Sequence, residues 1–414
     1  MKNKFIWDKY SDQPYPLADK KYKKLMKKKH IGDLLPLFFT NLIFFPLGVL
    51  CSFFLKKPER KADQFFALCV NLDKGDIQVP LVNELNCEDI QIRVPLADIA
   101  NLDQYVAFAQ KFPQCRILIN VLQDREHIDN PILLGQSITR IFAAFKTIAH
   151  QFQIGNAINR TKWGFFSVAE YLCFYQTVQQ IRNRDFPQLL LIGPSVIDYE
   201  YHFTVRALFN GFKVKYDKLA ALLYVDRRGA PENTQMGIFD TSRKIDFLYA
   251  LSKLSTKSTS DIIISEVNWP ITGTAPWAPT SETECVDEET YANYLLRYYL
   301  LALGSKKISS VYWHQLIAPG FGLIDNRDGF NKRVAFYVFK QMLSVLQNVV
   351  VKQLTITGQR YLLQCYKEQK NISVVWLNSE DKQLYEVSGK VFDKTGLALQ
   401  APIYISASPI YVLH

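Results

Sequence analysis

Apolar runs alternate with amphipathic stretches from residue 62 to about residue 346. The runs are short and rich in β-branched residues, which is typical of strands buried on both faces, whereas the stretches between them have helical periodicity. Strands are predicted at 65–71, 91–96, 116–123, 151–159, 189–196, 219–226, 261–267 and 308–316. Helices are predicted at 102–111, 138–150, 168–182, 241–254, 288–303 and 333–346.

Alternating strands and helices predict a parallel sheet. Eight strands over about 250 residues match the size of a (β/α)8 TIM barrel. An open doubly wound sheet is the competing interpretation, but no glycine-rich phosphate loop follows the first strand. We therefore expect a TIM barrel at 62–347.

The pattern changes after residue 347. Short strands with alternating polarity are predicted at 362–366, 372–377, 385–392, 403–405 and 410–413, with turn residues between them. This pattern is typical of antiparallel sheets. We expect a small C-terminal antiparallel β-sandwich at 348–414, packed on the barrel.

The N-terminal part, residues 1–61, has a different character. A polybasic run at 20–30 precedes twenty-two uncharged residues at 34–55, and further basic residues follow. As a helix, 34–55 would be about 33 Å long, enough for a hydrocarbon core of about 30 Å. The run is too long and begins too late for a cleaved signal peptide. A membrane anchor is predicted, with a soluble core helix as the other interpretation.

The anchor either spans the bilayer or lies in one leaflet. Pro36, Asn41, Pro46 and Gly48 interrupt the run, and both flanks are basic. Basic flanks favour the side of the membrane that carries anionic lipids. We expect a monotopic attachment to membrane lipids through 20–61, facing the cytoplasm.

Charge is distributed unevenly along the chain. Residues 1–61 hold fourteen Lys/Arg and five Asp/Glu, and subtracting these from the totals of 49 and 39 leaves 35 basic and 34 acidic residues for the rest. A nearly neutral body argues against nucleic-acid binding. The seven Cys form no CxxC pair and the six His are scattered, so neither a disulfide framework nor a metal site is predicted, and no cofactor motif is present.

The stretch 261–270 (DIIISEVNWP) carries the strongest chemical signal. Glu266 follows the buried run at 262–264, and Trp269 and Pro270 come directly after. A carboxylate at the carboxyl end of a barrel strand, beside an indole, is typical of a sugar-cleaving site. The alternative is a solvated Glu at a strand end.

The chain resembles the clan A retaining glycoside hydrolases over about residues 62–414. The resemblance rests on the barrel followed by a sandwich, on Gly155-Asn156-x-x-Asn159 and on Ser265-Glu266-Val267-Asn268-Trp269. It is nearest to the xylosidase- and iduronidase-like members. The resemblance implies Glu266 as nucleophile, Arg93 and Tyr224 as its supporting residues, and Trp313 as the floor of the sugar site. The implied sugar contacts also include Asn156, Asn159, Asn268 and Trp269.

One departure from the family pattern concerns the general acid. Where the family has Asn-Glu at the end of strand 4, this chain has Asn156-Ala157, and alanine can neither give nor take a proton. Three explanations stay open: an engineered change, another acid, or a barrel that binds sugar without turnover. Other acids near predicted strand ends are Asp226, Asp198, Glu200, His127 and His314.

Cationic residues also gather near predicted strand ends. Arg160 and Lys162 precede Trp163, which is a further predicted sugar contact, and Arg227 and Arg228 follow Asp226. Arginine grips a carboxylate or phosphate through two hydrogen bonds, so these residues favour an anionic sugar, although ordinary loop charge is the alternative.

The chain is also similar to clan A-like proteins encoded among lipopolysaccharide-core genes. That similarity implies a lipid-linked inner-core sugar such as 3-deoxy-octulosonate (Kdo) or heptose, at the cytoplasmic face of the bacterial inner membrane. A membrane-attached glycoside hydrolase is the first hypothesis. A non-catalytic glycan-binding or scaffold subunit with a protein partner, and a transglycosylase, are the alternatives.

Overall fold

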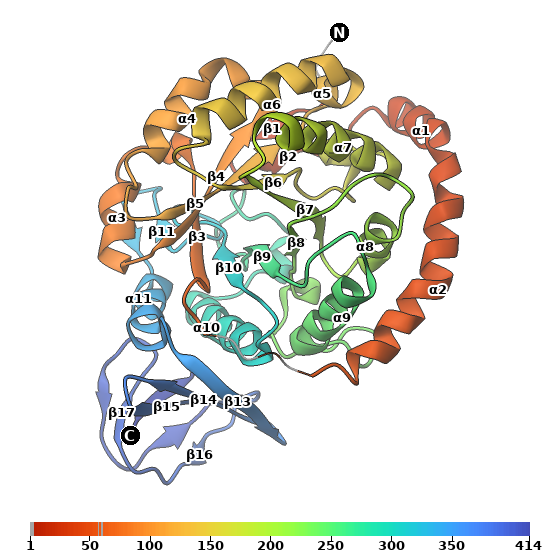
Figure 1. Ribbon diagram of the computed structural model, residues 1–414. Helices are drawn as coiled ribbons and strands as arrows, with labels where there is room; N and C mark the ends of the chain where they lie inside the picture. Colours follow the sequence, from red (N-terminus) through yellow and green to blue (C-terminus); the bar gives the residue numbers. More distant parts are fainter. Residues whose placement is uncertain (1–3, 57, 59–60) are drawn as a thin grey trace.

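The computed structural model describes residues 4–56, 58 and 61–414. Eight parallel strands close into a barrel in the order β10-β3-β4-β5-β6-β7-β8-β9 (Figure 1). The prediction of a TIM barrel is therefore confirmed. The strands are β3 (Phe66–Val70), β4 (Asp89–Pro95), β5 (Arg116–Leu122), β6 (Gln151–Ile154), β7 (Leu190–Ile197), β8 (Lys218–Leu222), β9 (Ile262–Val267) and β10 (Ser310–Trp313).

Both faces of these strands are buried, which explains their nearly continuous apolar sequences. One set of side chains fills the barrel interior, namely Ala67, Cys69, Leu118, Ile192, Ala220, Ile263 and Tyr312. The other set packs outward against the helices and forms the large core. Small and large side chains together fill the interior, so the barrel is a packed core without a pore.

A ring of helices surrounds the barrel (Figure 1). They are α3 (Gln78–Leu85), α4 (Leu102–Ala109), α5 (Arg125–Asp129), α6 (Pro131–Phe145), α7 (Val168–Asp185), α8 (Tyr201–Leu208), α9 (Thr241–Leu254), α10 (Glu288–Ser305) and α11 (Val334–Leu346). The six predicted helices are present, whereas α3, α5 and α8 were not predicted. These three have eight, five and eight residues and so offer few turns for a helical period, although the equally short α4 was predicted.

The strand predicted at 151–159 is shorter than expected. β6 ends at Ile154, because Gly155 adopts φ 84° and turns the chain out of the sheet. The following amide, Asn156 N–H, donates to the side chain of Gln123 at 2.9 Å. Residues 156–159 therefore lie on a loop at the carboxyl end of the barrel.

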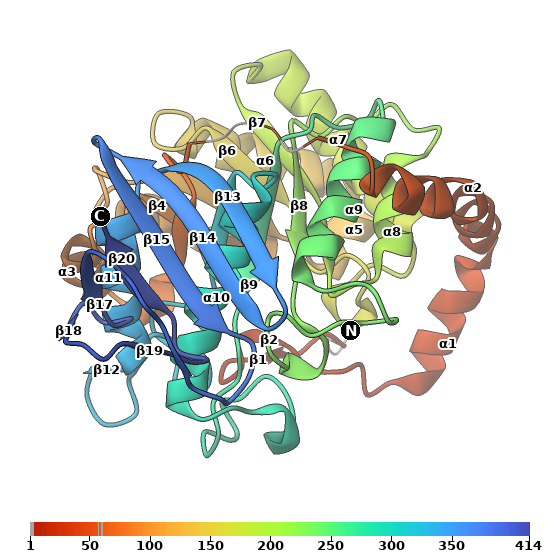
Figure 2. The same ribbon diagram turned by 90° about the horizontal axis from the view of Figure 1, so that it is seen from below.

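The C-terminal region is antiparallel, as predicted. Its main sheet has the order β13-β14-β15-β20-β17-β18, and a two-stranded sheet joins β16 to β19 (Figure 2). The strands are β13 (Val350–Thr357), β14 (Arg360–Lys367), β15 (Lys370–Leu377), β16 (Gln383–Leu384), β17 (Lys390–Phe392), β18 (Ala398–Leu399), β19 (Tyr404–Ile405) and β20 (Ile410–Leu413). β13 was not predicted, because most of its side chains are exposed.

The N-terminal residues form a hairpin followed by two helices. β1 (Trp7–Asp8) pairs with β2 (Gln13–Pro14), and we call residues 7–14 the N-terminal hairpin. α1 (Lys20–Lys29) and α2 (Leu34–Ser52) follow. Figures 1 and 2 place the hairpin at one end of the barrel and the two helices along its flank.

Residues 31–52 are long and apolar enough to cross a membrane, but one face of α2 packs on the barrel. Phe44 stacks on Phe209 with ring centroids 3.7 Å apart, and Asn41 donates to the carbonyl of His202 at 2.9 Å. Gly48 allows the closest approach, since a Cβ there would lie 2.7 Å from side-chain atoms of Phe247 and Leu251.

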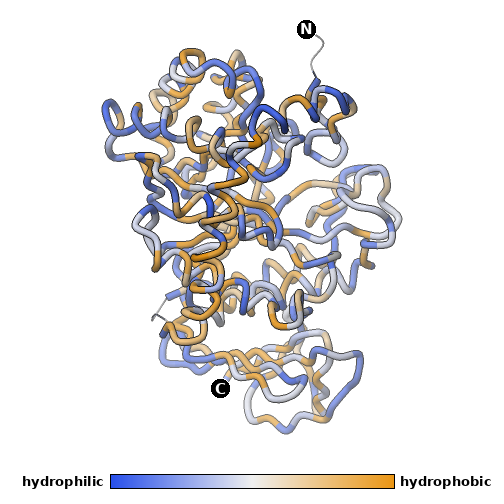
Figure 3. The backbone as a smooth tube through the Cα atoms, turned by 90° about the vertical axis from the view of Figure 1, so that its right-hand side faces the viewer, coloured by the Kyte–Doolittle hydropathy of each residue, from blue (hydrophilic) through white to orange (hydrophobic). Residues whose placement is uncertain are grey.

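A buried ion pair fixes the start of α2. Asp33 accepts from Arg206 at 2.7 Å, and both side chains are less than a tenth exposed. The opposite face of α2 is open to solvent. Figure 3, viewed from the side of the molecule on which α2 lies, colours the chain by the hydropathy of each residue. The exposed side chains of this face are Leu34, Leu35, Phe38, Phe39, Leu42, Ile43, Leu47 and Leu50.

Candidate active site

Glu266 lies at the carboxyl end of β9 and is held by residues from three other strands or their ends. Tyr224, just after β8, donates its hydroxyl to Oε1 at 2.6 Å. Arg93 of β4 forms an ion pair with Oε2, and the side-chain amide of Asn156 lies 3.4 Å from the same oxygen. The structure thus brings four predicted site residues together at the end of the barrel where TIM-barrel active sites lie.

The Glu266 carboxyl is buried, with 6% of the residue exposed. Burial alone would raise its pKa, but the charge of Arg93 and the hydrogen bonds from Tyr224 and Asn156 outweigh burial and lower it. Tyr224 shows the opposite effect, since burial and the adjacent carboxylate hold its pKa well above the usual value. At neutral pH the site therefore contains an ionised carboxylate that receives a hydrogen bond from a neutral phenol.

His314 follows β10 and is also buried. Burial, followed by the charge of Arg93, lowers the pKa of His314 to about 3, so its imidazole is neutral at pH 7. Arg93 is then the cation that faces Glu266. Asn268 donates to the carbonyl of His314 at 2.6 Å, which joins the ends of β9 and β10.

The loop after β6 carries Ala157, which the sequence resemblance predicts to stand where the clan A enzymes have their acid. Ala157 is fully buried and has φ 45°, in the left-handed region. Its neighbour Asn159 donates to Glu200 at 2.7 Å and to the carbonyl of Ile197 at 3.1 Å. Asn156 therefore reaches Glu266, whereas Asn159 connects the loops after β6 and β7.

The predicted cationic residues lie around the mouth of the barrel. Arg160 pairs with Asp198 and Glu200, both at 2.5 Å, so its charge is compensated. Lys162 donates to Gln13 of the N-terminal hairpin at 2.6 Å, and burial lowers its pKa. Arg228 lies over the ring of Tyr224, 3.8 Å from the centroid. The side chain of Arg227 lies outside the described part of the chain.

Three predicted residues do not reach the site. Trp269 and Trp313 stack on each other with centroids 5.9 Å apart and are fully buried, so neither offers a ring face to a sugar. Trp313 donates to the hydroxyl of Tyr291 on α10 at 2.9 Å, which shows that it points outward from the barrel. His127 lies on α5 and bonds to Asp124 and Ser137. Trp163, 6.0 Å from the guanidinium of Arg93, is the predicted indole that does lie at the site.

Sequence reasoning missed three polar residues on the far side of Arg93 from Glu266. Asn71 and Gln315 follow β3 and β10, and both bind the carboxylate of Asp12 from the N-terminal hairpin. Asn71 and Gln315 could have been found, because polar residues at the carboxyl ends of barrel strands are candidates for a site. Asp12 gave no signal, since its partners are distant in sequence.

Two hollows open at the mouth. One, of about 650 Å³, is lined by Tyr10, Asp12, Trp277 and Gln315, among others. The second, of about 360 Å³, is lined by Arg160, Tyr224, Asp226 and Arg228, among others.

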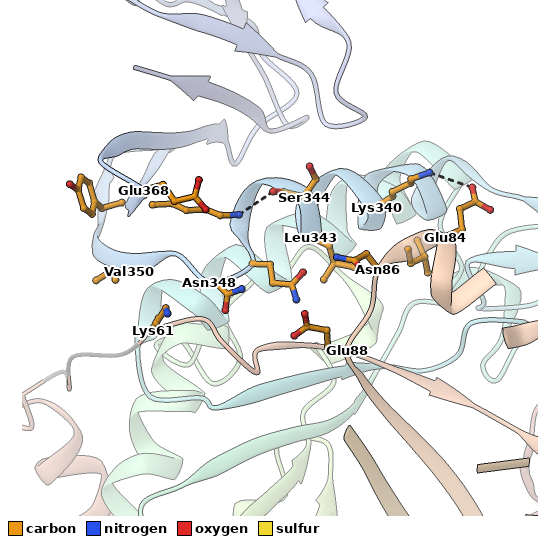
Figure 4. Close-up of a pocket in the computed structure, with 14 residues that line it drawn as sticks. Lys61, Glu84, Asn86, Glu88, Lys340, Leu343, Ser344, Asn348, Val350 and Glu368 are labelled. Carbon is orange, nitrogen blue, oxygen red and sulfur yellow. Dashed lines mark hydrogen bonds and ion pairs between the residues drawn. The ribbon is translucent and has the colours of Figure 1, made fainter. Parts of the chain in front are cut away.

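A third hollow, of about 690 Å³, lies between α3, α11 and the C-terminal sheet (Figure 4). Its residues Asn86 and Glu88 precede β4, so it lies at the opposite end of the barrel, where TIM-barrel active sites do not occur. Among the described residues, no group of three or more His, Cys, Asp or Glu could hold a metal ion.

Comparisons with known proteins find similarity in structure. No family model and no curated protein matches the sequence. A family 39 glycoside hydrolase from Bacteroides cellulosilyticus WH2 superposes with a TM-score of 0.66 at 14% sequence identity, covering 86% of this chain and 81% of the other. A GH30 endoxylanase from Clostridium papyrosolvens C71 gives 0.59 at 8% identity, with 87% and 98% covered. A GH39 β-xylosidase from Caulobacter crescentus gives 0.57 at 10%, with 86% and 97% covered.

The structural neighbours and the observed strand order agree on the fold of this chain. The likeness covers 86–87% of this chain, and its low identity makes it evidence of fold alone. The chain has the TIM-barrel fold, with an appended antiparallel sheet, that clan A glycoside hydrolases of families 39 and 30 share.

Proposed function

We propose that this protein is a retaining glycoside hydrolase with Glu266 as its nucleophile. One observation carries the proposal: an ionised, buried carboxylate at the end of β9 is oriented by Arg93 and by the Tyr224 hydroxyl at 2.6 Å. Perturbed, fixed carboxylates in a barrel mouth are characteristic of catalytic sites. The fold shared with glycoside hydrolases supports the same reaction class.

The chemistry would proceed in two displacements. A Glu266 oxygen attacks the anomeric carbon as the bond to the leaving oxygen breaks, which forms a glycosyl ester. Water then attacks the same carbon and gives its proton to the residue that had protonated the leaving oxygen, and the carboxylate is released. Arg93 and Tyr224 hold the carboxylate in position and stabilise its charge, so it pays no reorganisation cost during the attack.

Asp226 is the carboxyl best placed to replace the missing acid. It lines the same hollow of about 360 Å³ as Tyr224. Asp198 and Glu200 line it too, but Arg160 pairs with both. Within the described part of the chain, the side chain of Asp226 has no such partner. We therefore assign Asp226 the role of protonating the leaving oxygen.

Replacing Asp226 by asparagine tests this role. A general acid contributes about 10²–10⁴ in rate, so we expect a loss of that size with alkyl or 4-nitrophenyl glycosides. The loss should be small with 2,4-dinitrophenyl glycosides, whose leaving group needs no proton. Steady-state rates across the series measure the difference. An equal loss for all leaving groups would remove Asp226 from the mechanism.

The Ala157→Glu variant is the companion control. With Asp226 as the acid, a carboxyl at 157 should give no gain in hydrolysis. A large gain would instead indicate a barrel that has lost its acid. That outcome would favour the second candidate function, a glycan-binding or scaffold subunit of a lipopolysaccharide-processing complex, which Ala157 itself suggests. Transfer of the glycosyl ester to a sugar would make the protein a transglycosylase.

We further propose that α1 and α2 attach the protein to a membrane surface. α2 packs one face on α8 and α9 and leaves its apolar opposite face exposed, which supports lying in one leaflet more than spanning. Lys20, Lys21, Lys24, Lys27, Lys28 and Lys29 of α1 are exposed and suit anionic lipids. The substrate would be an anionic lipid-linked sugar, such as a Kdo of the lipopolysaccharide inner core, at the cytoplasmic face of the bacterial inner membrane.

Charges on the open face of α2 should detach the protein. Phe38 and Leu42 are 60% and 61% exposed, so aspartate at both positions should leave the barrel folded. Burying a large apolar side chain contributes about 1.5–3 kcal/mol, and we expect at least a tenfold weaker partition onto anionic vesicles. Sedimentation with vesicles measures this. Ile132→Asp on α6, with 76% exposure, is the matched control. Unchanged partition of the double variant would place the attachment elsewhere.

A further inference from the structure

The tip of the N-terminal hairpin inserts an aspartate into the candidate active site. Oδ2 of Asp12 accepts from Nη1 of Arg93 at 2.8 Å and from the side-chain amide of Asn71 at 3.0 Å. The side-chain amide of Gln315 donates to the same oxygen, and Nε2 of His314 lies 3.9 Å from it. Groups from the ends of β3, β4 and β10 therefore converge on a single carboxylate oxygen.

Arg93 links the two carboxylates of the site. Its Nη1 binds Asp12 and its Nη2 binds Glu266, and the arginine is 5% exposed. A buried guanidinium with amide donors beside it is well suited to hold a carboxylate. The barrel thus supplies a carboxylate-binding site directly adjacent to the proposed nucleophile.

The hairpin supplies hydrogen-bond partners to only some of the buried polar atoms around this site. Nε of Arg93, Oδ1 of Asn71 and Nδ1 of His314 are buried and have no hydrogen-bond partner among the described residues. Buried polar atoms are normally paired, so unpaired ones around a site point to a ligand with more polar groups than the tip provides. A sugar acid, with a carboxylate and several hydroxyls on one ring, has such groups.

The hairpin also separates Glu266 from solvent. Glu266 lines neither of the two hollows at the mouth, one of which includes Asp12 and the other Tyr224. A sugar carbon can therefore reach the Glu266 carboxylate only after side chains at the mouth move, and the tip is a candidate because Arg93 joins Asp12 directly to Glu266. At the rim, Trp7 lies edge-on to Trp163 and Tyr10 lies edge-on to Trp277. Gln13 accepts from Lys162 and donates to the carbonyl of Pro279, and Arg93 also donates to the carbonyl of Asp12. Trp7 and Tyr10 are each 42% exposed, so withdrawal of the hairpin would uncover little core.

We propose that Asn71, Arg93 and Gln315 form a binding site for the carboxylate of a sugar acid, and that Asp12 of the same chain fills this site in competition with the ligand. The identity of the ligand as a sugar rests on the proposed function. The site distinguishes a sugar acid from a neutral sugar, because the neutral sugar has no group to replace the Asp12 carboxylate. The N-terminal hairpin is then an internal competitor that a matching ligand displaces.

Binding of free sugar acids to an Asp12→Ala variant tests the proposal. The probes are 3-deoxy-octulosonate and glucuronate, and glucuronate methyl ester serves as the uncharged comparison. When a ligand must displace a tethered competitor, its apparent affinity is its intrinsic affinity multiplied by the fraction of molecules in which the competitor has left the site. We expect at least one of the acids to bind Asp12→Ala tenfold or more tighter than the wild-type chain by calorimetry, and the ester to gain less than threefold.

Two further variants make the result specific. Asp19→Ala removes the same charge from the same segment, at the start of α1 and away from Arg93, and should bind like the wild type. Adding Gln315→Leu to Asp12→Ala should reverse the gain, because it removes a donor from the carboxylate site. Circular dichroism of each variant checks the fold.

One result with the Asp12→Ala variant would contradict the proposal. Unchanged or weaker binding of both acids by a folded Asp12→Ala protein would overturn the competitor and make Asp12 a structural or substrate-contacting residue. Because the readout is equilibrium binding, the Asp12→Ala gain is expected even if no turnover is found. Failure of the proposed hydrolase activity would therefore not be mistaken for failure of the carboxylate site.

Discussion

Glu266→Gln should reduce turnover by at least about 10³-fold, because the amide cannot form the glycosyl ester. Gln has nearly the same shape as Glu, and its single amide oxygen can still accept from either Tyr224 or Arg93, so the fold should persist. Steady-state kinetics on aryl glycosides measure the loss, and circular dichroism with thermal unfolding checks the fold.

A chemical rescue sharpens the test of Glu266. In Glu266→Ala, added azide can enter the vacated space and attack the anomeric carbon, which should restore part of the turnover and give a glycosyl azide. Its anomeric configuration, opposite to that of the substrate, would show that the residue had acted as nucleophile. Tyr224→Phe, which loses one hydrogen bond to Oε1, is the mild companion and should retain activity at a reduced rate. Full activity of Glu266→Gln would dispose of the nucleophile assignment.

Arg93→Met should have the largest effect on stability, about 3–5 kcal/mol in the free energy of unfolding. Arg93 is the cation between two buried or half-buried carboxylates, Glu266 and Asp12. Methionine fills similar space but leaves both charges uncompensated. Urea unfolding followed by fluorescence measures the loss.

The pH dependence should also change sign. In the wild type the lowered pKa of Glu266 means that its stabilising contribution is present above the unfolded-state value near 4.5 and is lost as pH falls. Without Arg93 burial dominates and raises the pKa of Glu266, so the contribution is present at low pH and is lost as pH rises. Adding Glu266→Gln to Arg93→Met should recover part of the stability. If Arg93→Met unfolds like the wild type, the guanidinium is not the compensating charge.

Patterns that repeat along the chain predicted the fold well. The eight apolar runs gave all eight barrel strands, because a parallel strand covered on both faces is apolar at almost every position. The antiparallel C-terminal region followed from alternating polarity. β13 was not predicted, because most of its side chains are exposed and too few of them are apolar to mark a strand.

The candidate site was predictable where it depends on strand ends and not where it depends on distant contacts. Glu266, Arg93, Asn156 and Tyr224 meet because the barrel brings the carboxyl ends of its strands together. The same logic failed for Trp313, whose ring points outward to α10, since position at a strand end does not fix the direction of a side chain. Asp12 reaches Arg93 across 81 positions of sequence, and no local pattern predicts such a contact.

The way α2 packs has a consequence for which sugars the protein could reach. α2 runs around the flank of the barrel and not along its axis (Figures 1 and 2). If a bilayer contacts the open face of α2, the barrel axis would lie parallel to the membrane plane. The mouth of the barrel would then face along the layer of lipid headgroups. Such an enzyme would act on the first sugars above the lipid, and the outer residues of a long glycan would extend past the entrance without being processed.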